Sequence, residues 1–224
     1  MNFITQIIVP YDLAIHKLRI RDSYDWHQKI WEAFVDQGFQ KRKFLARLDE
    51  KEEGYRLLIV SSVEPQKPDW CPTDRFKCKS IPDSFLEHKH YRFNLLANPT
   101  KKVIDPQKKK VFNSDGKPLG NKNSKRVPLV CREDLVQWIQ RKGANGGFEV
   151  DPETLKTIPR RREYFSKPGH AGQSGHRGVH SAIEFQGTLH VTDTQKFHDT
   201  FYKGIGSAKA FGFGLLLLIP FTNN

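Results

Sequence analysis

Apolar and polar residues alternate along the chain in patterns that predict strands and helices in a recurring order. Residues 2–9, NFITQIIV, are rich in β-branched and aromatic side chains and predict a strand that Pro10 ends. Residues 24–36 follow with a helical pattern that Asp22 or Ser23 begins as the N-cap. The apolar face of this helix consists of Trp26, Ile30, Trp31, Phe34 and Val35. Two strands, at 43–48 and 55–63, flank the polar turn EKEEG.

The second half of the chain repeats this order with longer polar inserts. Residues 90–99, HYRFNLLANP, predict a strand, and residues 132–143 predict a helix that leaves through Gly143. The stretch 180–193 is typical of a hairpin that turns near Gln186 and Gly187. A short helix ending at Gly204 and a final strand, GLLLLIPF, complete the chain.

Strand, helix and strands in turn, twice over, predict an α+β protein of two tandem ferredoxin-like (RRM-like) domains. The chain of 224 residues has room for two small domains with ordinary cores. We place the boundary after residue 88, with domains at 1–88 and 89–224, although no strict internal repeat supports the duplication.

A formal net charge of +12 favours a partner of opposite sign, with nucleic acid or an anionic surface first, over a merely basic soluble protein. The three cysteines, Cys71, Cys78 and Cys131, include no C-x-x-C pair and suggest neither a disulfide framework nor a zinc site. They fit a reducing cytoplasm best. The N-terminus has no signal-peptide pattern, and the longest apolar run, FGFGLLLLIPF, is too short for a bilayer, so we expect no membrane partner.

Two basic segments are candidates for RNA binding. Residues 101–126 hold nine Lys or Arg and two Asp, and phosphates are the natural counter-charge, although the charge run alone favours a solvated disordered loop. Residues 159–180 are more specific because they combine arginines, which grip phosphates, with aromatic rings that stack on unpaired bases. The candidate RNA-binding residues of the two segments are Lys101, Lys102, Arg160, Arg161, Arg162, Lys167 and Arg177.

The helix at 24–36 carries a candidate chemical site. Tyr24 and His27 lie one turn apart on one side, at the edge of the apolar face. An isolated histidine there is ordinarily a structural boundary residue. With RNA as the substrate, however, an imidazole can remove the 2′-OH proton or protonate the 5′-oxygen, and nearby Lys or Arg can stabilise the charged phosphorane without a metal. No D-x-D or H-E-x-x-H motif predicts a metal site.

The stretch GIGSAKAFGFG, 204–214, has the glycine content of a nucleotide-binding loop but not its context. Lys209 occupies the sixth position of a would-be G-x-G-x-x-G, and too few residues follow for a βαβ unit, so no nucleotide cofactor is expected. The four glycines at 204, 206, 212 and 214 either allow tight helix–strand packing or bring backbone N–H groups to a phosphate. Ser207 and Lys209 add a donor and a charge for RNA in the second case.

The same motif resembles the C-terminal signature of the CRISPR repeat-cleaving endoribonucleases, closest to the subunit found in type I-E Cascade complexes. Three further segments are similar to that subgroup, namely YDWH at 24–27, YRFNLLANPTK at 91–101 and RVPL at 126–129. The four segments spread over nearly the whole chain.

This resemblance implies two tandem ferredoxin-like domains and metal-independent cleavage of precursor CRISPR RNA at the base of each repeat hairpin. The products would be a 2′,3′-cyclic phosphate or 3′-phosphate and a 5′-OH, and the enzyme would stay bound to the hairpin within Cascade. The catalytic histidine of the subgroup, in a Tyr-x-x-His context, maps onto His27 with Tyr24 as its helper. The stem-gripping arginine segment maps onto Arg160, Arg161 and Arg162. A non-catalytic RNA-hairpin-binding subunit of the same complex is the alternative.

Overall fold

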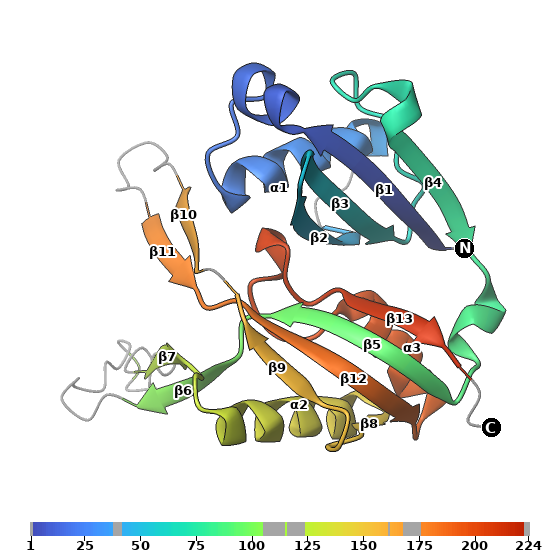
Figure 1. Ribbon diagram of the computed structural model, residues 1–224, viewed down its shortest axis with the longest axis vertical. Coiled ribbons are helices and arrows are strands. Elements are labelled where there is room, and N and C mark those ends of the chain that lie inside the picture. Colours follow the sequence, from blue (N-terminus) through green and yellow to red (C-terminus); the bar gives the residue numbers. More distant parts are fainter. Residues whose placement is uncertain are drawn as a thin grey trace.

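The computed structural model describes residues 2–37, 42–104, 115, 124–160, 162–167 and 176–221. Two antiparallel sheets lie one above the other (Figure 1). The upper sheet is built from residues 2–81 and the lower from residues 90–220. The predicted α+β fold with two tandem ferredoxin-like units is confirmed, whereas the boundary at residue 88 stays a prediction.

The first sheet has four strands in the order β2-β3-β1-β4. The strands are β1 (Asn2–Pro10), β2 (Phe44–Lys51), β3 (Gly54–Ser61) and β4 (Phe76–Ile81). The connection from β1 to β2 holds a π-helical turn, η1 (Leu13–Lys17), the helix α1 (Ser23–Trp31) and a 3-10 segment, η2 (Glu32–Gln37). The helix predicted over 24–36 is therefore α-helical only to Trp31. Residues 62–75, all described, contain no α-helix where a ferredoxin-like unit has its second, and only the short η3 (Thr73–Arg75) precedes β4.

The second sheet has the equivalent order β13-β5-β12-β8, and β9 pairs with the other end of β12 from β8. Its strands are β5 (His90–Ala97), β8 (Phe148–Val150), β9 (Lys156–Pro159), β12 (Ile183–Val191) and β13 (Leu216–Pro220). Its helices are α2 (Arg132–Gly146) and α3 (Thr194–Lys203), and η4 (Asp83–Leu86) precedes β5. The helix α2 covers the side of this sheet that faces away from the first sheet (Figure 1).

Two local predictions are wrong, each for an identifiable reason. The helix α2 does not leave through Gly143 but continues to Gly146, and Gly147 ends it with a φ of 79°. Gly143 is instead packed so tightly that an added Cβ would lie 2.6 Å from the Phe148 carbonyl oxygen. Residues 183–191 form one continuous strand, not a hairpin, because Gly187 allows close packing of Thr154 against the middle of β12.

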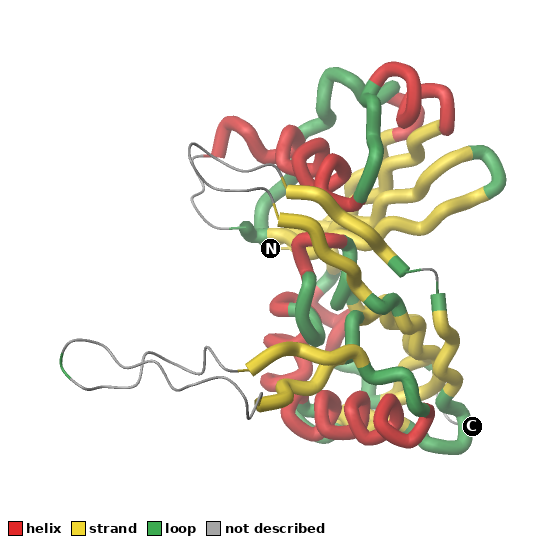
Figure 2. Tube along the Cα trace, turned by 90° about the vertical axis from the view of Figure 1, so that its left-hand side faces the viewer, coloured by secondary structure: helices red, strands yellow, loops and turns green. Residues whose placement is uncertain are grey.

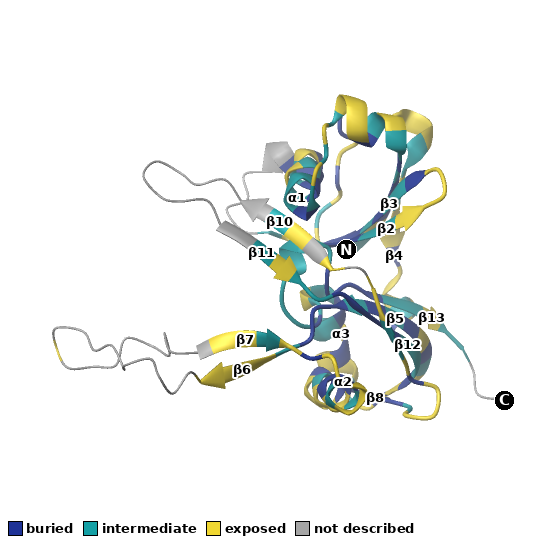
Figure 3. Ribbon diagram, turned by 60° about the vertical axis from the view of Figure 1, so that its left-hand side comes forward, coloured by how far each residue is buried: buried dark blue, intermediate teal, exposed yellow. Residues whose placement is uncertain are grey.

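Two ribbons leave the second unit at its basic inserts. The strands β6 (Thr100–Ile104) and β7 (Ser124–Pro128) pair antiparallel and project from the body, with exposed residues along both (Figures 2 and 3). The strands β10 (Glu163–Lys167) and β11 (His176–His180) form the second ribbon, which passes beside α1 of the first unit. Sequence patterns had indicated only basic, polar segments at both places.

The apolar core has two clusters that meet at the first sheet. One face of that sheet packs under α1 through Ile7, Phe44 and Leu57, joined by Trp26 from the helix. Leu45 and Val60, on the opposite face of β2 and β3, belong to the core of the second unit. The two units therefore share buried surface.

Candidate active site

The helix α1 places its candidate residues through a well-formed N-terminus and two buried anchors. The Asp22 carboxylate accepts hydrogen bonds from the backbone N–H groups of Tyr24 at 2.8 Å and Asp25 at 3.2 Å. Trp26 and Ile30 are buried against the sheet, which sets the rotation of the helix. Tyr24 and His27 consequently lie together at the edge of this buried face, partly exposed, as their spacing predicts.

His27 is held in an aromatic setting that keeps its ring neutral. Its Nε2 accepts a hydrogen bond from the Trp31 indole N–H at 3.0 Å, and its ring lies 6.1 Å from the Phe44 ring, centroid to centroid. Burial, and after it the charge of Arg42, lowers the pKa of His27 from 6.5 to about 4. At neutral pH the imidazole therefore carries a lone pair rather than a charge.

Cations from both units gather near this histidine. Arg42 precedes β2, lies 6.0 Å above the Phe44 ring, and has a pKa lowered by burial. Lys209 comes from η5 (Lys209–Phe211) at the other end of the chain. Burial, and then the charges of Arg42 and Lys142, lowers the pKa of Lys209. Like charges this close repel one another, so a bound anion would stabilise all of them.

A cavity of about 480 Å³ lies among these cations, between β2 and β3 of the first unit and α3 and η5 of the second. Its lining residues are Arg42, Lys43, Phe44, Leu45, Val60, Ser61, Ser62, Tyr202, Lys203 and Lys209. No Asp or Glu is among these described residues. His27 does not line the cavity, but Phe44 contacts both the cavity and the His27 ring. The arrangement fits an anionic group that passes from the cavity toward His27.

The glycine-rich segment is the turn that brings Lys209 to this place. Gly204, Gly206, Gly212 and Gly214 all have φ between 74° and 88°, in the left-handed region that glycine favours. An added Cβ at Gly214 would lie 2.6 Å from the Ile205 carbonyl oxygen, and the Ile205 N–H donates to the Gly214 carbonyl oxygen at 2.9 Å. Positive φ at all four positions, together with tight packing at Gly204 and Gly214, is thus sufficient reason for these glycines. The segment η5 packs against α1 and β2, so the turn contacts the helix that carries His27.

The polar residues of this turn already have partners within the protein. The Lys209 ammonium donates to the Lys203 carbonyl oxygen at 2.6 Å, at the C-terminus of α3, and the Ser207 hydroxyl donates to the Asn98 carbonyl oxygen at 3.2 Å. RNA contacts by Ser207 and Lys209 stay predictions. Ser207 holds the turn to the end of β5, whereas Lys209 keeps a charge beside Arg42.

Aromatic stacking attaches the ribbon β10–β11 to the same turn. The Phe165 ring stacks on the His180 ring at 4.8 Å and lies 4.5 Å from the Phe211 ring of η5. Tyr164, on the same strand, is 66% exposed. The structure describes the strand positions of Lys167 and Arg177 but not their side chains. Arg161 lies outside the described residues. Their RNA contacts stay predictions.

Arg160 lies at the start of this ribbon and is bound to a buried carboxylate. Its guanidinium pairs with Glu184 of β12, which is 3% exposed and also accepts from Asn94 at 2.5 Å. Arg47 of β2 reaches the same network, 3.5 Å from Glu184. Burial raises the pKa of Glu184, but hydrogen bonds from Asn94, Gln186 and Arg160 outweigh it and lower the pKa to about 2. The network ties the two sheets together, and Arg160 keeps a half-exposed side chain.

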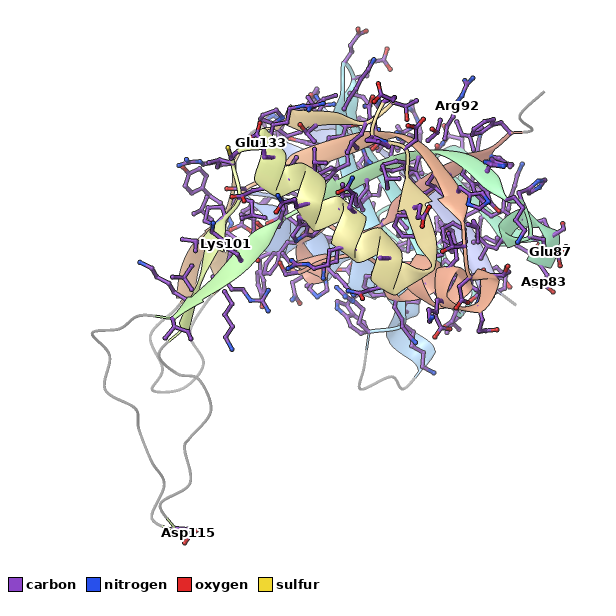
Figure 4. The ribbon with its side chains drawn as sticks, turned by 90° about the horizontal axis from the view of Figure 1, so that it is seen from below. Asp83, Glu87, Arg92, Lys101, Asp115 and Glu133 are labelled. Carbon is purple, nitrogen blue, oxygen red and sulfur yellow. The ribbon has the colours of Figure 1, made fainter. Side chains whose placement is uncertain are left out.

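The remaining predicted RNA-binding residues lie on the ribbons of the second unit. Arg162 is exposed just before β10, and Lys101 and Lys102 are exposed on β6. The Lys101 ammonium lies 3.5 Å from the Asp134 carboxylate at the start of α2, and Figure 4 shows it at the base of the projecting ribbon. RNA contacts by these three residues stay predictions.

The structure adds Arg42 and Phe44, which the sequence patterns did not single out, and it gives Trp31, predicted only as part of the apolar face, a hydrogen bond to His27. The run QKRKF, 40–44, concentrates charge immediately before a strand and was the available signal for Arg42. Over the described residues, no three His, Cys, Asp or Glu side chains gather as a metal site would require. No helix in the described part is long and apolar enough to cross a membrane.

Comparisons with known proteins identify a family and related structures. The sequence profile of a family described as "CRISPR associated protein" matches residues 3–220. A Cascade subunit of Escherichia coli K12, CasE, is 31% identical over 202 residues, covering 89% of this chain and 93% of its own. The CRISPR-associated endoribonuclease Cse3 of Thermus thermophilus is 24% identical over 237 residues, covering 97% and 100%. The crystal structure of Cas6e from Escherichia coli K-12 superimposes with a TM-score of 0.67 at 27% identity, covering 99% and 100%.

Proposed function

This chain belongs to the CRISPR associated protein family, and from that premise we propose that it is an endoribonuclease that cleaves CRISPR precursor RNA. It cuts within the repeat, at the base of the hairpin, without a metal ion. It then stays bound to the mature RNA as a subunit of Cascade. The names of its relatives support the class of activity, since Cse3 is an endoribonuclease and CasE a Cascade subunit.

The observation that carries the proposal is a neutral histidine beside cations that come from both units. His27 has a pKa of about 4, Arg42 lies next to it, and Lys209 lies next to Arg42 in the lining of a cavity that is carboxylate-free as far as it is described. A phosphodiester is the anion that an RNA would supply there. Bound next to His27, it would also raise the pKa of the imidazole, because a negative charge favours the protonated ring.

The chemistry follows from the substrate. The 2′-oxygen attacks the adjacent phosphorus, its proton leaves to a base, and the bond from phosphorus to the 5′-oxygen breaks as that oxygen gains a proton. The products are a 2′,3′-cyclic phosphate and a 5′-OH. His27 serves as base, acid or both, Tyr24 assists it, and Arg42 with Lys209 stabilises the additional negative charge of the phosphorane. The predicted RNA-binding cations of the two ribbons hold the stem together with Arg160, Arg161 and Arg162.

One observation favours the alternative of a non-catalytic RNA-hairpin-binding subunit. The Nε2 of His27 is already engaged by Trp31, as it would be for a purely structural histidine. Both functions predict tight binding of the repeat hairpin, so only the appearance of products separates them.

The test is a repeat RNA incubated with the protein in EDTA, with products resolved on a denaturing gel. We expect a single cut with a cyclic phosphate end, loss of the cut in His27→Ala, and loss of the cut when the 2′-OH at the cleavage site is replaced by hydrogen. The matched control is His198→Ala, an exposed histidine on α3, which should cleave normally. Cleavage that needs a divalent ion, or that survives the deoxy substitution, would overturn the mechanism. Tight binding without products would establish the alternative.

Retention in Cascade has its own readout. After complete cleavage, an excess of labelled hairpin is added to compete for the RNA-binding site. The 3′ hairpin product should stay bound, so that little label enters the complex. Rapid exchange of the product would contradict a permanent subunit.

A further inference from the structure

Trp31 determines which nitrogen of His27 is free. Its indole N–H is a donor and cannot accept, so the His27 Nε2 that it contacts at 3.0 Å has to present a lone pair. A neutral imidazole has one N–H, which then belongs to Nδ1. We propose that Trp31 is a positioning residue that holds His27 as the Nδ1–H tautomer in a fixed ring orientation, so that Nδ1 is the nitrogen that meets the RNA.

The packing around Trp31 supports a fixed donor rather than a chance contact. The Trp31 ring meets the His27 ring edge-on, at 78°, and meets the Phe44 ring edge-on at 5.2 Å. Phe44 is itself buried and stacked on Phe34 at 4.8 Å. Trp31 is also the last residue of α1, and the backbone leaves helical geometry at Phe34, whose φ is −132°. The indole is therefore held from both the helix end and β2.

The hydrogen bond also restricts the protonation of His27. If Nε2 gained a proton, two N–H groups would face each other and the bond to Trp31 would be lost. Arg42 before β2 disfavours the same charge. Of the elements that pack against α1, η2 contributes Glu32, which pairs with Lys29, η5 contributes Lys209, and β10 contributes Tyr164. While Trp31 stays in place, His27 offers RNA an N–H at Nδ1. It can accept a proton only after the indole moves away.

This inference rests on the proposed function for its effect on rate, but its first test needs no RNA. Long-range ¹H–¹⁵N spectra of the imidazole at pH 7 should show His27 with a protonated Nδ1 and a bare Nε2. In Trp31→Phe, which keeps an aromatic ring and removes the donor, the proton should redistribute toward Nε2. Trp70→Phe is the matched control, because Trp70 lies in the segment before β4 and makes no contact with His27 among those the structure describes.

The second test is single-turnover cleavage as a function of pH. Trp31→Phe should lower the rate constant about 10- to 100-fold, as losses of groups that orient a reactive side chain do, with RNA affinity unchanged. The midpoint that belongs to His27 should move to higher pH, because a donor that opposes protonation is gone. If Trp31→Phe does not fold, 3-benzothienylalanine at position 31 keeps the indole shape without its N–H.

The outcomes separate the two proposals. A wild-type protein that never cleaves repeat RNA refutes the proposed function and leaves the tautomer measurement standing. A wild-type protein that cleaves, with Trp31→Phe equal to it in rate and pH profile, refutes the role of Trp31 alone. An Nε2–H tautomer in the wild type refutes it as well.

Discussion

The two sheets have the same strand order but differ in what is attached to it. The first sheet carries one α-helix, α1, and a described segment without an α-helix where the second would be. The second sheet carries α2 and α3, two ribbons and the glycine-rich turn (Figure 1). The candidate catalytic histidine is on the simpler unit, whereas the predicted RNA-binding residues are all on the elaborated one.

This difference shows that neither unit holds the candidate site by itself. His27 and Arg42 come from the first unit, and Lys209 comes from the second, carried there by a turn that packs on α1 and β2. The same turn holds the ribbon β10–β11 through Phe211 and Phe165. In the proposed function, substrate binding and chemistry are therefore coupled through the contact between units, and substitutions can test each side of that contact separately.

The largest effect should come from the cation of the first unit. Arg42→Ala removes the charge next to His27 and should lower the cleavage rate constant about 100- to 1,000-fold, the usual loss for one group that stabilises a charged transition state. RNA affinity should fall much less. The control is Arg75→Ala in the same unit, a partly exposed arginine paired with Asp74, which should cleave like the wild type. An equal loss in both variants would mean that net charge, not position, matters.

The next effect concerns the buried network between the sheets. Glu184→Gln removes a carboxylate that Arg160 and Arg47 share, and should lower the free energy of unfolding by about 2 to 3 kcal/mol, because a buried partner loses its counter-charge. Asp199→Asn, which breaks an exposed pair with Lys203, should cost less than about 0.5 kcal/mol. Urea denaturation measures both. Equal small losses would show that the network does not join the units.

The same variant gives a pH dependence with a definite sign. The pKa of Glu184 is about 2 in the folded protein, below its ordinary value of about 4.3. A lowered pKa contributes stability that is present above the ordinary value and disappears as the pH falls through the folded value. The difference in unfolding free energy between wild type and Glu184→Gln should therefore be constant above about pH 5 and shrink toward pH 2. A difference that grows on acidification would contradict the paired carboxylate.

Sequence patterns predicted the fold class and the position of His27 at the edge of the first helix's apolar face because both depend on local signals. The core strands show a clear pattern of apolar and polar residues. The Asp22 cap and the apolar face of the first helix lie close together in the chain. The hairpin predicted within 183–191 failed because Gly187 serves a tertiary contact with Thr154 that no local pattern reveals. Arg42 and Lys209 meet only through folding, because they are far apart in the chain and the charge run around Arg42 resembles an ordinary solvated segment.

A smaller effect should come from the cation of the second unit. Lys209→Ala should weaken RNA binding about tenfold and reduce the slope of log affinity against log salt by about one, since one phosphate contact is lost. The cleavage rate of saturated enzyme should change less than in Arg42→Ala. Lys196→Ala, an exposed lysine on α3 paired with Asp193, is the control. An unchanged salt slope would show that Lys209 only caps α3 through its bond to the Lys203 carbonyl.

The smallest effect should come from the turn that joins the units. Two substitutions with opposite effects on the free energy of unfolding can measure it. Gly212 has a φ of 87°, and an added Cβ would meet only the Leu48 backbone nitrogen, at 3.7 Å, so Gly212→Ala should cost only the strain of a left-handed residue, about 1 kcal/mol. Ala208 is left-handed as well, with a φ of 61°, so Ala208→Gly should relieve strain and leave stability equal or slightly higher. Thermal unfolding of the two variants checks this. A loss well above about 1 kcal/mol in Gly212→Ala would mean that the turn packs more closely on β2 than its geometry indicates. The cleavage rate of this variant would then fall as well, because Lys209 and Arg42 would be forced apart.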